Sequence, residues 1–172
     1  MRGAVVLLML GLAACSSGSG GPAPAVPAGA AVVVRPVDGD TVVVDIDGQD
    51  EPVRLIGIDT PESVAPDRPV ECFGPEAKAR TAELLPKGTV VRLERDVEAR
   101  DRYDRLLAYV IRAEDDVLVN LRLVQEGFAE SIAYPPNLAH QRELDGAEAA
   151  ARAAQKGLWP ACGGTDAPIE PG

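Results

Sequence analysis

Short runs of β-branched residues, broken by turns that contain Asp-Gly, limit the fold of this chain more than any other feature of its sequence. Three runs follow one another closely, over Ala30–Val37, Thr41–Ile46 and Val53–Ile58. Residues Asp38–Asp40 separate the first two runs, and the stretch "DGQDEP" separates the second from the third. Valine and isoleucine favour strands, whereas Asp, Gly and Pro favour turns. The pattern therefore predicts a three-stranded meander at the start of a folded domain.

Two further strands and three helices are expected after the meander, from turn residues, caps and apolar spacings of three and four. The expected segments are a helix from Gly74 that stops before Pro86, strands over Thr89–Asp96 and Leu106–Ile111, a short helix that Asn120 caps and Gly127 ends, and a helix over about Leu138–Gln155. Helices inserted after the third and the fifth strand suggest a small closed barrel. The prediction is an α+β protein with a mainly β core, a five-stranded OB-fold barrel with three helices.

The first 14 residues have the layout of a lipoprotein signal peptide. A positively charged start precedes an apolar run from Ala4 to Leu12, and Leu12–Cys15 reads "LAAC". The run is too short to span a bilayer. The ending resembles the bacterial lipobox, in which Cys15 would become the lipidated first residue of the mature protein. The alternative is an ordinary signal peptide with an incidental cysteine.

Composition divides the remaining chain into three parts. Residues 15–30 are rich in Gly, Ser, Pro and Ala, which is typical of a flexible linker that becomes stiffer toward its end. Residues 31–162 are long enough for one domain with a modest core. Residues 163–172 are expected to form a disordered tail. The expected location is the outer face of the bacterial cell membrane, or the medium after release.

Two cysteines remain once Cys15 is assigned to the lipid. An even pair outside the cytoplasm favours a disulfide between Cys72 and Cys162. It would close a loop of about ninety residues, which the chain-entropy model values at roughly 4–5 kcal/mol. Two unpaired thiols are the alternative.

The net charge of −10 argues, taken alone, against a nucleic acid as the partner. Proteins that bind polyanions usually carry a basic surface, and a negative surface slows the encounter. A local cleft lined by arginines would resolve this conflict, and the expected members are Arg35, Arg54, Arg102 and Arg105.

Two carboxylates are expected to meet at one end of the meander, because Asp40 begins its second strand and Asp59 ends its third. Neighbouring carboxylates repel unless a cation lies between them. The Thr60 carbonyl could supply another oxygen, and hard oxygen ligands favour calcium or magnesium. Zinc is disfavoured because no cluster of Cys and His is present.

Three further charged residues complete a set suited to phosphodiester hydrolysis. Glu62, just past the third strand, can orient or deprotonate a water molecule. Arg54 and Arg105 carry planar, permanently charged groups that suit phosphate oxygens. Each residue taken alone is better explained as a solvated charge or a member of an ion pair.

Several short motifs together resemble the staphylococcal nuclease (thermonuclease) family. They are "VDGDT", "VRLIGIDTPE", "GPEA", "DRYDRLLAYV", "VNLRLVQEGFA" and "YPPN…GLW", and they occur in the family's order over nearly all of Val32–Trp159. Each motif is weak alone, but the collinear set is specific. The resemblance implies an OB-fold and calcium-dependent cleavage of DNA and RNA to products that end in a 3′-phosphate.

The resemblance also implies a role for each matching residue. The calcium ligands fall on Asp40, Asp59 and the Thr60 carbonyl; the catalytic set is Arg54, Glu62 and Arg105; and the substrate-binding residues are Arg102, Tyr103 and Tyr134. The chain departs from the family at Asp104, where a glycine is usual, and this acid could tie up Arg105. A second pocket tyrosine is missing near Ile132–Ala133. The single histidine, His140, receives no role.

The leading hypothesis is a monomeric, exported and lipid-anchored nuclease that uses calcium to cleave single-stranded or locally open DNA and RNA. One alternative is a non-catalytic OB-fold module that binds oligonucleotides or a protein at the cell surface. A structural lipoprotein would explain the acidic surface but not the convergence of the motifs. The complete catalytic set favours the enzyme.

Overall fold

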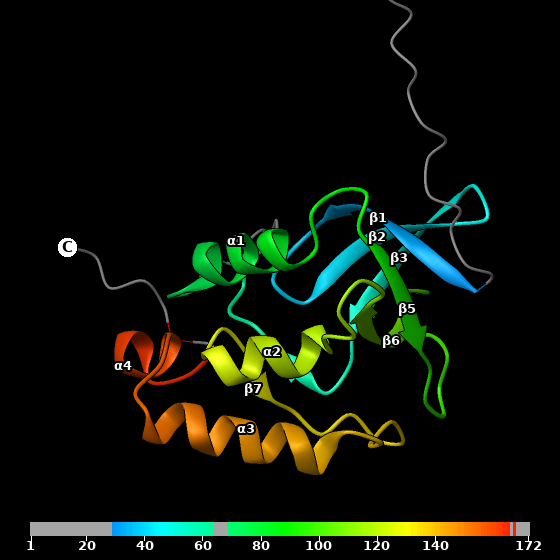
Figure 1. Ribbon diagram of the computed structural model, residues 1–172. Helices are drawn as coiled ribbons and strands as arrows, with labels where there is room; N and C mark the ends of the chain where they lie inside the picture. Colours follow the sequence, from blue (N-terminus) through cyan, green and yellow to red (C-terminus); the bar gives the residue numbers. More distant parts are fainter. Residues whose placement is uncertain (1–28, 64–68, 166, 168–172) are drawn as a thin grey trace, which may run out of the picture.

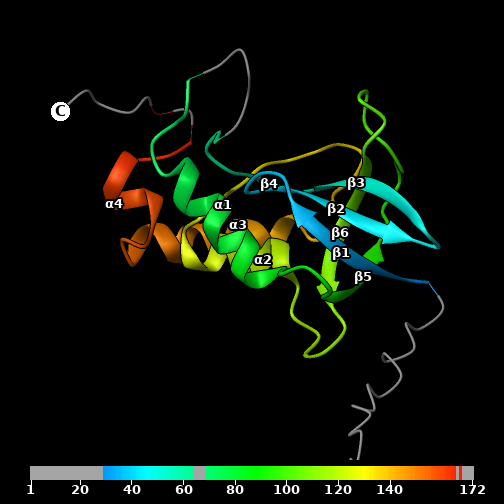
Figure 2. The same cartoon turned by 90° about the horizontal axis from the view of Figure 1, so that it is seen from above.

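Five strands close into a barrel, and the helices gather on one side of it (Figures 1 and 2). The computed structural model describes residues 29–63, 69–165 and 167. The barrel strands are β1 (Ala30–Pro36), β2 (Thr41–Ile46), β3 (Gln49–Leu55), β5 (Val90–Glu94) and β6 (Leu106–Arg112). Their order is β1-β2-β3-β6-β5, with β5 paired back to β1 and only the β3–β6 pair parallel. This closure confirms the predicted α+β class and the five-stranded OB-fold barrel.

The turn between β2 and β3 is shorter than predicted. Asp47 and Gly48 alone form it, with φ angles of 54° and 85°, as favoured two-residue hairpin turns require. Strand β3 therefore starts at Gln49 rather than Val53, so the assignment of "DGQDEP" to a turn was wrong. Pro52 is tolerated inside the strand because β6 pairs with β3 only from Val53 onward.

The predicted third strand also ends earlier, because Gly57 breaks it. Gly57 has a φ of 79°, and after it the chain leaves the barrel as the short strand β4 (Ile58–Asp59). Strand β4 pairs with β7 (Glu130–Ser131), a strand that the sequence did not indicate. The break carries Asp59 and the residues after it out of the barrel wall.

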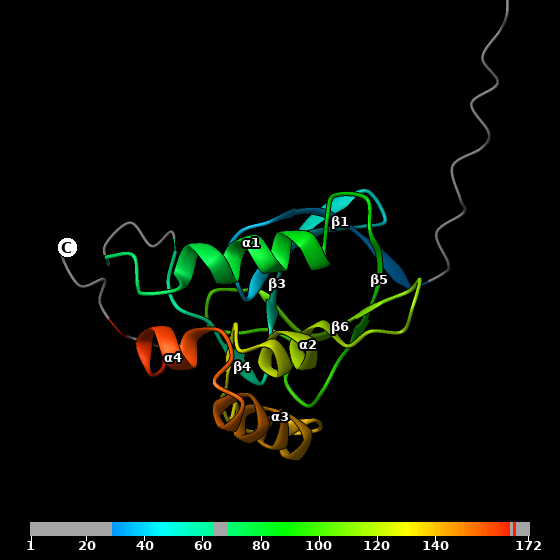
Figure 3. The same cartoon turned by 60° about the vertical axis from the view of Figure 1, so that its left-hand side comes forward.

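Four helices lie among the described residues, one more than predicted. They are α1 (Gly74–Leu84), α2 (Val119–Glu126), α3 (Gln141–Ala153) and the unpredicted α4 (Leu158–Cys162). Helix α2 lies between α1 and α3 (Figure 3). Asn120 does not cap α2; it is buried, where it donates to the Ile56 carbonyl over 2.8 Å and accepts from the Val110 amide over 2.9 Å.

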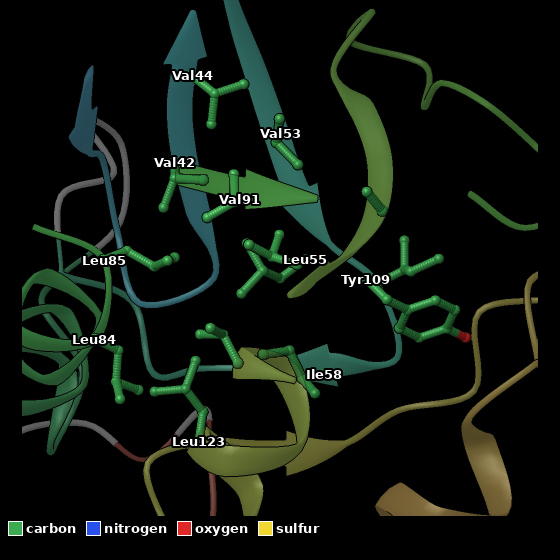
Figure 4. Packing of buried hydrophobic residues seen from close by; sticks show 14 of the residues in the cluster. Val42, Val44, Val53, Leu55, Ile58, Leu84, Leu85, Val91, Tyr109 and Leu123 are labelled. Carbon is green, nitrogen blue, oxygen red and sulfur yellow. The ribbon is translucent and has the colours of Figure 1, made fainter. Parts of the chain in front are cut away.

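One continuous apolar core fills the barrel and the space beneath the helices. Figure 4 shows Val42, Val44 and Val53 inside the barrel, with Leu55 between them and Leu123 of α2. A small second cluster joins Ala151, Leu158 and Trp159, with Phe73 packed against it.

A disulfide joins Cys72, just before α1, to Cys162 at the end of α4, with 5.9 Å between the Cα atoms. The predicted signal peptide, the lipidation site Cys15 and nearly all of the linker lie outside the described residues, so these assignments stay predictions. Among the described residues no helix is both long and apolar enough to cross a membrane.

Candidate active site

The Asp38–Asp40 turn packs directly on the chain that leaves the barrel after β4. A Cβ atom at Gly39 would lie 2.5 Å from the Thr60 hydroxyl oxygen, so only glycine fits at this position. The Asp40 carbonyl accepts the Leu55 amide over 2.8 Å, which fixes the turn to the end of β3. Asp40 therefore comes close to both Thr60 and Arg54.

An acidic pocket of about 210 Å³ lies at this junction. Its lining residues are Asp38, Asp40, Thr41, Arg54, Asp59, Thr60, Glu62, Glu71 and Arg105. Five carboxylates thus face two arginines. All six residues expected to bind metal or act in catalysis line this one pocket, together with Asp38 and Glu71, which were not assigned to the site.

Arg54 bridges the two aspartates that were expected to hold a metal. Its Nη1 lies 2.9 Å from Asp40 Oδ2, its Nη2 lies 3.0 Å from Asp59 Oδ1, and its side chain is 13% exposed. Arg54 Nη1 also donates to the Leu55 carbonyl over 2.9 Å. The guanidinium compensates both negative charges, whereas the sequence had suggested that it faces phosphate alone.

The oxygen donors around Asp40 fit a hard divalent cation. Asp40 Oδ2 accepts from the Thr60 amide over 3.3 Å and from its hydroxyl over 3.2 Å, which keeps Thr60 beside the carboxylate. Among the described residues, no three His, Cys, Asp or Glu side chains are grouped to hold a metal. Two carboxylates alone would therefore need other oxygen ligands to complete the shell of a bound cation. Two carboxylates, a carbonyl, water and a substrate phosphate match the oxygen shells of calcium and magnesium, and the excess of acid favours a cation.

Glu62 lies within a hydrogen-bonded group of polar side chains. Its Oε1 accepts from the Ser63 amide over 3.0 Å, and the Ser63 hydroxyl donates to Asp38 through a short hydrogen bond. Burial raises the pKa of Asp38 to about 6, aided by a hydrogen bond to Glu62 and by the charge of Asp40, against the lowering effect of hydrogen bonds from Ser63 and the Gly39 backbone. Asp38 and Glu62 are therefore linked through Ser63, which donates its hydroxyl to Asp38 and its amide to Glu62.

Asp101, rather than Asp104, is the partner of Arg105. Arg105 Nε donates to Asp101 Oδ2 over 2.7 Å, and Arg105 Nη1 reaches the Thr41 hydroxyl at 3.4 Å. Burial alone would raise the pKa of Asp101, but hydrogen bonds from Arg105 and from the Tyr103 backbone outweigh it and lower that pKa. The Asp104 carboxylate instead lies 3.6 Å from Arg100, so the expectation that Asp104 could tie up Arg105 was wrong.

A second, larger pocket of about 700 Å³ adjoins the first, because both are lined by Arg54 and Arg105. Its other lining residues are Glu98, Arg100, Asp101, Arg102, Tyr103 and Tyr134. Four arginines against two acids make this pocket locally basic in an acidic protein. Arg100 lines this pocket although it was not predicted to do so. Arg35, which was expected in the arginine cleft, lines neither pocket.

Aromatic rings contribute to the second pocket from two directions. The Arg102 guanidinium lies 4.7 Å from the centre of the Tyr103 ring, and its Nη2 donates to the Tyr103 hydroxyl over 2.6 Å. Tyr134 comes from the turn before α3, where buried Asn137 accepts the Glu98 amide over 2.8 Å. All three residues predicted to bind substrate thus line one pocket.

The fold and this site define an OB-fold protein in which an acidic pocket and an arginine-rich pocket share a wall. Residues 52–161 match the family described as Staphylococcal nuclease homologue. The chain therefore belongs to the staphylococcal nuclease family, as the motifs had indicated.

Three relatives show the extent of the similarity. The chain is 43% identical over 128 residues to the thermonuclease of Staphylococcus intermedius, which covers 74% of each chain. It is 41% identical over 127 residues to the thermonuclease of Staphylococcus hyicus, covering 74% of this chain and 73% of that one. Endonuclease YncB of Bacillus subtilis (strain 168) is 35% identical over 127 residues, covering 73% of this chain and 59% of that one.

Proposed function

We propose that the protein is a calcium-dependent phosphodiesterase that hydrolyses DNA and RNA to products ending in a 3′-phosphate. The observation that carries this proposal is the shared wall of the two pockets, where Arg54 and Arg105 lie between the carboxylates and the basic, aromatic pocket. This arrangement supports a phosphate at the wall, with hydrolytic groups on one side and the nucleotide on the other. Membership of a nuclease family and the names of the relatives point the same way.

In this proposal Asp40, Asp59 and the Thr60 carbonyl hold the calcium ion. When bound there, the ion would supply positive charge to stabilise the phosphate oxygens in the transition state. Two carboxylates leave coordination positions open for water and substrate. The surplus of acid in the pocket supports this assignment.

Glu62 acts as the general base that takes a proton from the attacking water. A bond forms between the water oxygen and phosphorus, the bond between phosphorus and the 5′-oxygen breaks, and the 5′-oxygen leaves as a hydroxyl after taking a proton from solvent, so the phosphate stays on the 3′-oxygen. Arg54 and Arg105 donate to the non-bridging oxygens, where negative charge gathers in the transition state. Arg105 enters this role already oriented by Asp101.

Arg102, Tyr103 and Tyr134 bind the nucleotide in the second pocket. Arg102 pairs with a terminal phosphate, and the tyrosine rings provide faces for the sugar and base. A base reaches such a pocket only when it is unstacked, so the expected substrate is single-stranded or locally open. The basic pocket resolves the conflict with the net charge of −10.

The proposal includes export, with Cys15 as a lipid anchor on the outer face of the bacterial membrane or with later release of the protein. The Cys72–Cys162 disulfide supports an oxidising location. The linker would hold a monomeric domain away from the membrane surface. Mass spectrometry of the protein from membranes would show a lipidated N-terminal cysteine, and an unmodified N-terminus at another residue would contradict the anchor.

Digestion of plasmid DNA and of RNA by the purified, oxidised protein tests the proposed activity. Cleavage is expected with calcium, not with a chelator, and Glu62→Ser should lower kcat by about 10²–10⁴-fold. The exposed Glu83→Gln variant is the control for a changed acidic residue. Binding without cleavage across a range of calcium and magnesium concentrations would instead favour the non-catalytic OB-fold module.

A further inference from the structure

Glu71 holds the main chain of Glu62 through two hydrogen bonds of opposite direction. The Glu71 amide donates to the Glu62 carbonyl over 2.8 Å. The Glu62 amide donates to Glu71 Oε2 over 2.7 Å. Both polar groups of the Glu62 backbone are thus bound by one residue nine positions later.

The turn that carries Glu71 also presses directly against the Glu62 backbone. A Cβ atom at Gly74 would lie 2.4 Å from the Glu62 carbonyl oxygen and 3.2 Å from that of Pro61. The Gly74 amide donates to the Glu71 carbonyl over 3.0 Å, which closes the turn at the start of α1. The position of Glu62 therefore depends on where this turn lies.

A covalent bond fixes the turn to the opposite end of the chain. Cys72 follows Glu71 directly, and its disulfide with Cys162 ties the turn to α4, which lies beside the start of α1 (Figure 3). Phe73 adds a non-covalent contact, with its ring centre 5.4 Å from that of Phe128. Glu71 therefore sits between a covalent anchor and the backbone of the proposed general base.

We propose that Glu71 is a positioning residue for Glu62, and that the Cys72–Cys162 disulfide keeps Glu71 in place. This inference rests on the proposed role of Glu62 as general base. A general base must lie within hydrogen-bond reach of the water it deprotonates, and a displacement of about 1 Å can cost a factor of about 10² in rate. The role of Glu71 is to accept the Glu62 amide, and it requires an oxygen atom rather than a charge.

The kinetic test compares Glu71→Ala with Glu71→Gln on a short single-stranded DNA in calcium. Glu71→Ala should lower kcat by about 10–100-fold, with KM within about threefold, because Glu62 moves while the substrate pocket stays. Glu71→Gln keeps an acceptor oxygen and should retain kcat within about threefold of the native protein. Glu76→Ala, an exposed glutamate in the first turn of α1, is the matched control.

The disulfide is tested with Cys72→Ser/Cys162→Ser. This variant should lower kcat less than Glu71→Ala does, because the Phe73 contact remains. When Cys72→Ser/Cys162→Ser is combined with Glu71→Ala, kcat should fall by less than a further twofold below that of Glu71→Ala alone. The reason is that both changes act through the same hydrogen bonds. If the loss of kcat in the combined variant equals the product of the two separate losses, the disulfide does not act through Glu71.

Hydrogen exchange of the Glu62 amide gives a readout that does not depend on catalysis. Exchange should be at least about tenfold faster in Glu71→Ala than in Glu71→Gln or Glu76→Ala. Native kcat and native exchange in Glu71→Ala would overturn the inference, as would an equal loss of kcat in the Ala and Gln variants. If the native protein does not cleave, yet Glu71→Ala still speeds this exchange, the proposed function fails while the positioning role stands.

Discussion

Asp101 and Arg105 form a close ion pair, with 2.7 Å between Oδ2 and Nε and only 2% of the Asp101 side chain exposed. Asp101 Oδ1 also accepts the backbone amides of Tyr103 and Arg105, each over 2.9 Å. One buried carboxylate thus fixes both the turn and the direction of the arginine that faces the two pockets. The family motif placed Arg105 in the site, but only the structure identifies the residue that orients it.

Asp101→Asn should therefore reduce both activity and stability. The amide keeps one acceptor oxygen but loses the charge that pairs with Arg105, so kcat should fall by about tenfold or more. The lost charge-assisted hydrogen bond should lower the free energy of unfolding by about 1.5–3 kcal/mol. Steady-state cleavage and urea unfolding measure the two effects, and native values for both would contradict the role given to Asp101.

Asp104→Gly is expected to change kcat by no more than about twofold, which reflects the small contribution of exposed ion pairs. The Asp104 carboxylate is 87% exposed and faces Arg100 rather than Arg105. Its φ of 65° suits glycine, so the substitution relieves backbone strain. Cleavage kinetics of Asp104→Gly, measured alongside those of Asp101→Asn, test this assignment. A tenfold increase in kcat of Asp104→Gly would mean that Asp104 restrains Arg105.

Gly39→Ala should weaken cation binding, because the new Cβ would collide with the Thr60 side chain 2.5 Å away. Separation of Thr60 from Asp40 would spread the proposed oxygen ligands. We expect a loss of about 1–3 kcal/mol in unfolding free energy from the overpacking and a higher calcium concentration for half-maximal cleavage. Gly146→Ala is the control for a Gly-to-Ala change, because Gly146 lacks a positive φ and nothing lies within 4 Å of an added Cβ. Unchanged calcium dependence in Gly39→Ala would contradict the proposed ligand set.

His140 should make stability depend on pH. Burial of the ring lowers its pKa, but hydrogen bonds to Glu94 and Glu143, at 2.9 Å and 3.4 Å, outweigh burial and raise the pKa above 6.5. The charged form is thus favoured in the folded state, so this stabilisation is complete below the ordinary pKa of 6.5 and is lost as pH rises through the raised value.

Urea unfolding of the native protein and of His140→Gln measures this effect. The difference between their unfolding free energies should shrink as pH rises from about 5.5 to 8.5, the range around an ordinary histidine pKa. A difference that stays constant or grows with pH would show that the ion pairs with Glu94 and Glu143 do not stabilise the fold.

The sequence predicted elements best where local chemistry and tertiary packing agree. Thr41–Ile46 was predicted with its exact bounds, since β-branched residues lie between two turns that contain Asp-Gly. The polar start of β3 at Gln49 was missed, because its strand conformation comes from pairing with β2 rather than from its own composition. Asn120 has a side chain that suits a helix cap, but in the structure this side chain forms hydrogen bonds with the buried backbone groups of Val110 and Ile56 instead.

The site was predictable to the extent that family motifs marked it. Asp38 and Asp101 lie within the motifs "VDGDT" and "DRYDRLLAYV", but neither they nor Glu71 were given a role, because the sequence does not show which of its 27 Asp and Glu residues are buried against their partners. Their importance comes from burial and from partners far along the chain or across a turn. Likewise, no spacing rule could show that Arg54 lies between Asp40 and Asp59, because that contact depends on the side-chain conformations at the end of β3.

The position of Arg54 has a consequence for how the protein tolerates the absence of metal. The guanidinium acts as an internal counter-ion for Asp40 and Asp59, so calcium bound as proposed would replace one cation with another rather than neutralise bare charge. The domain should therefore fold and unfold cooperatively in a chelating buffer that abolishes cleavage. In the proposed exported protein the barrel and the disulfide would thus form without calcium, and cleavage would begin only once the ion is bound.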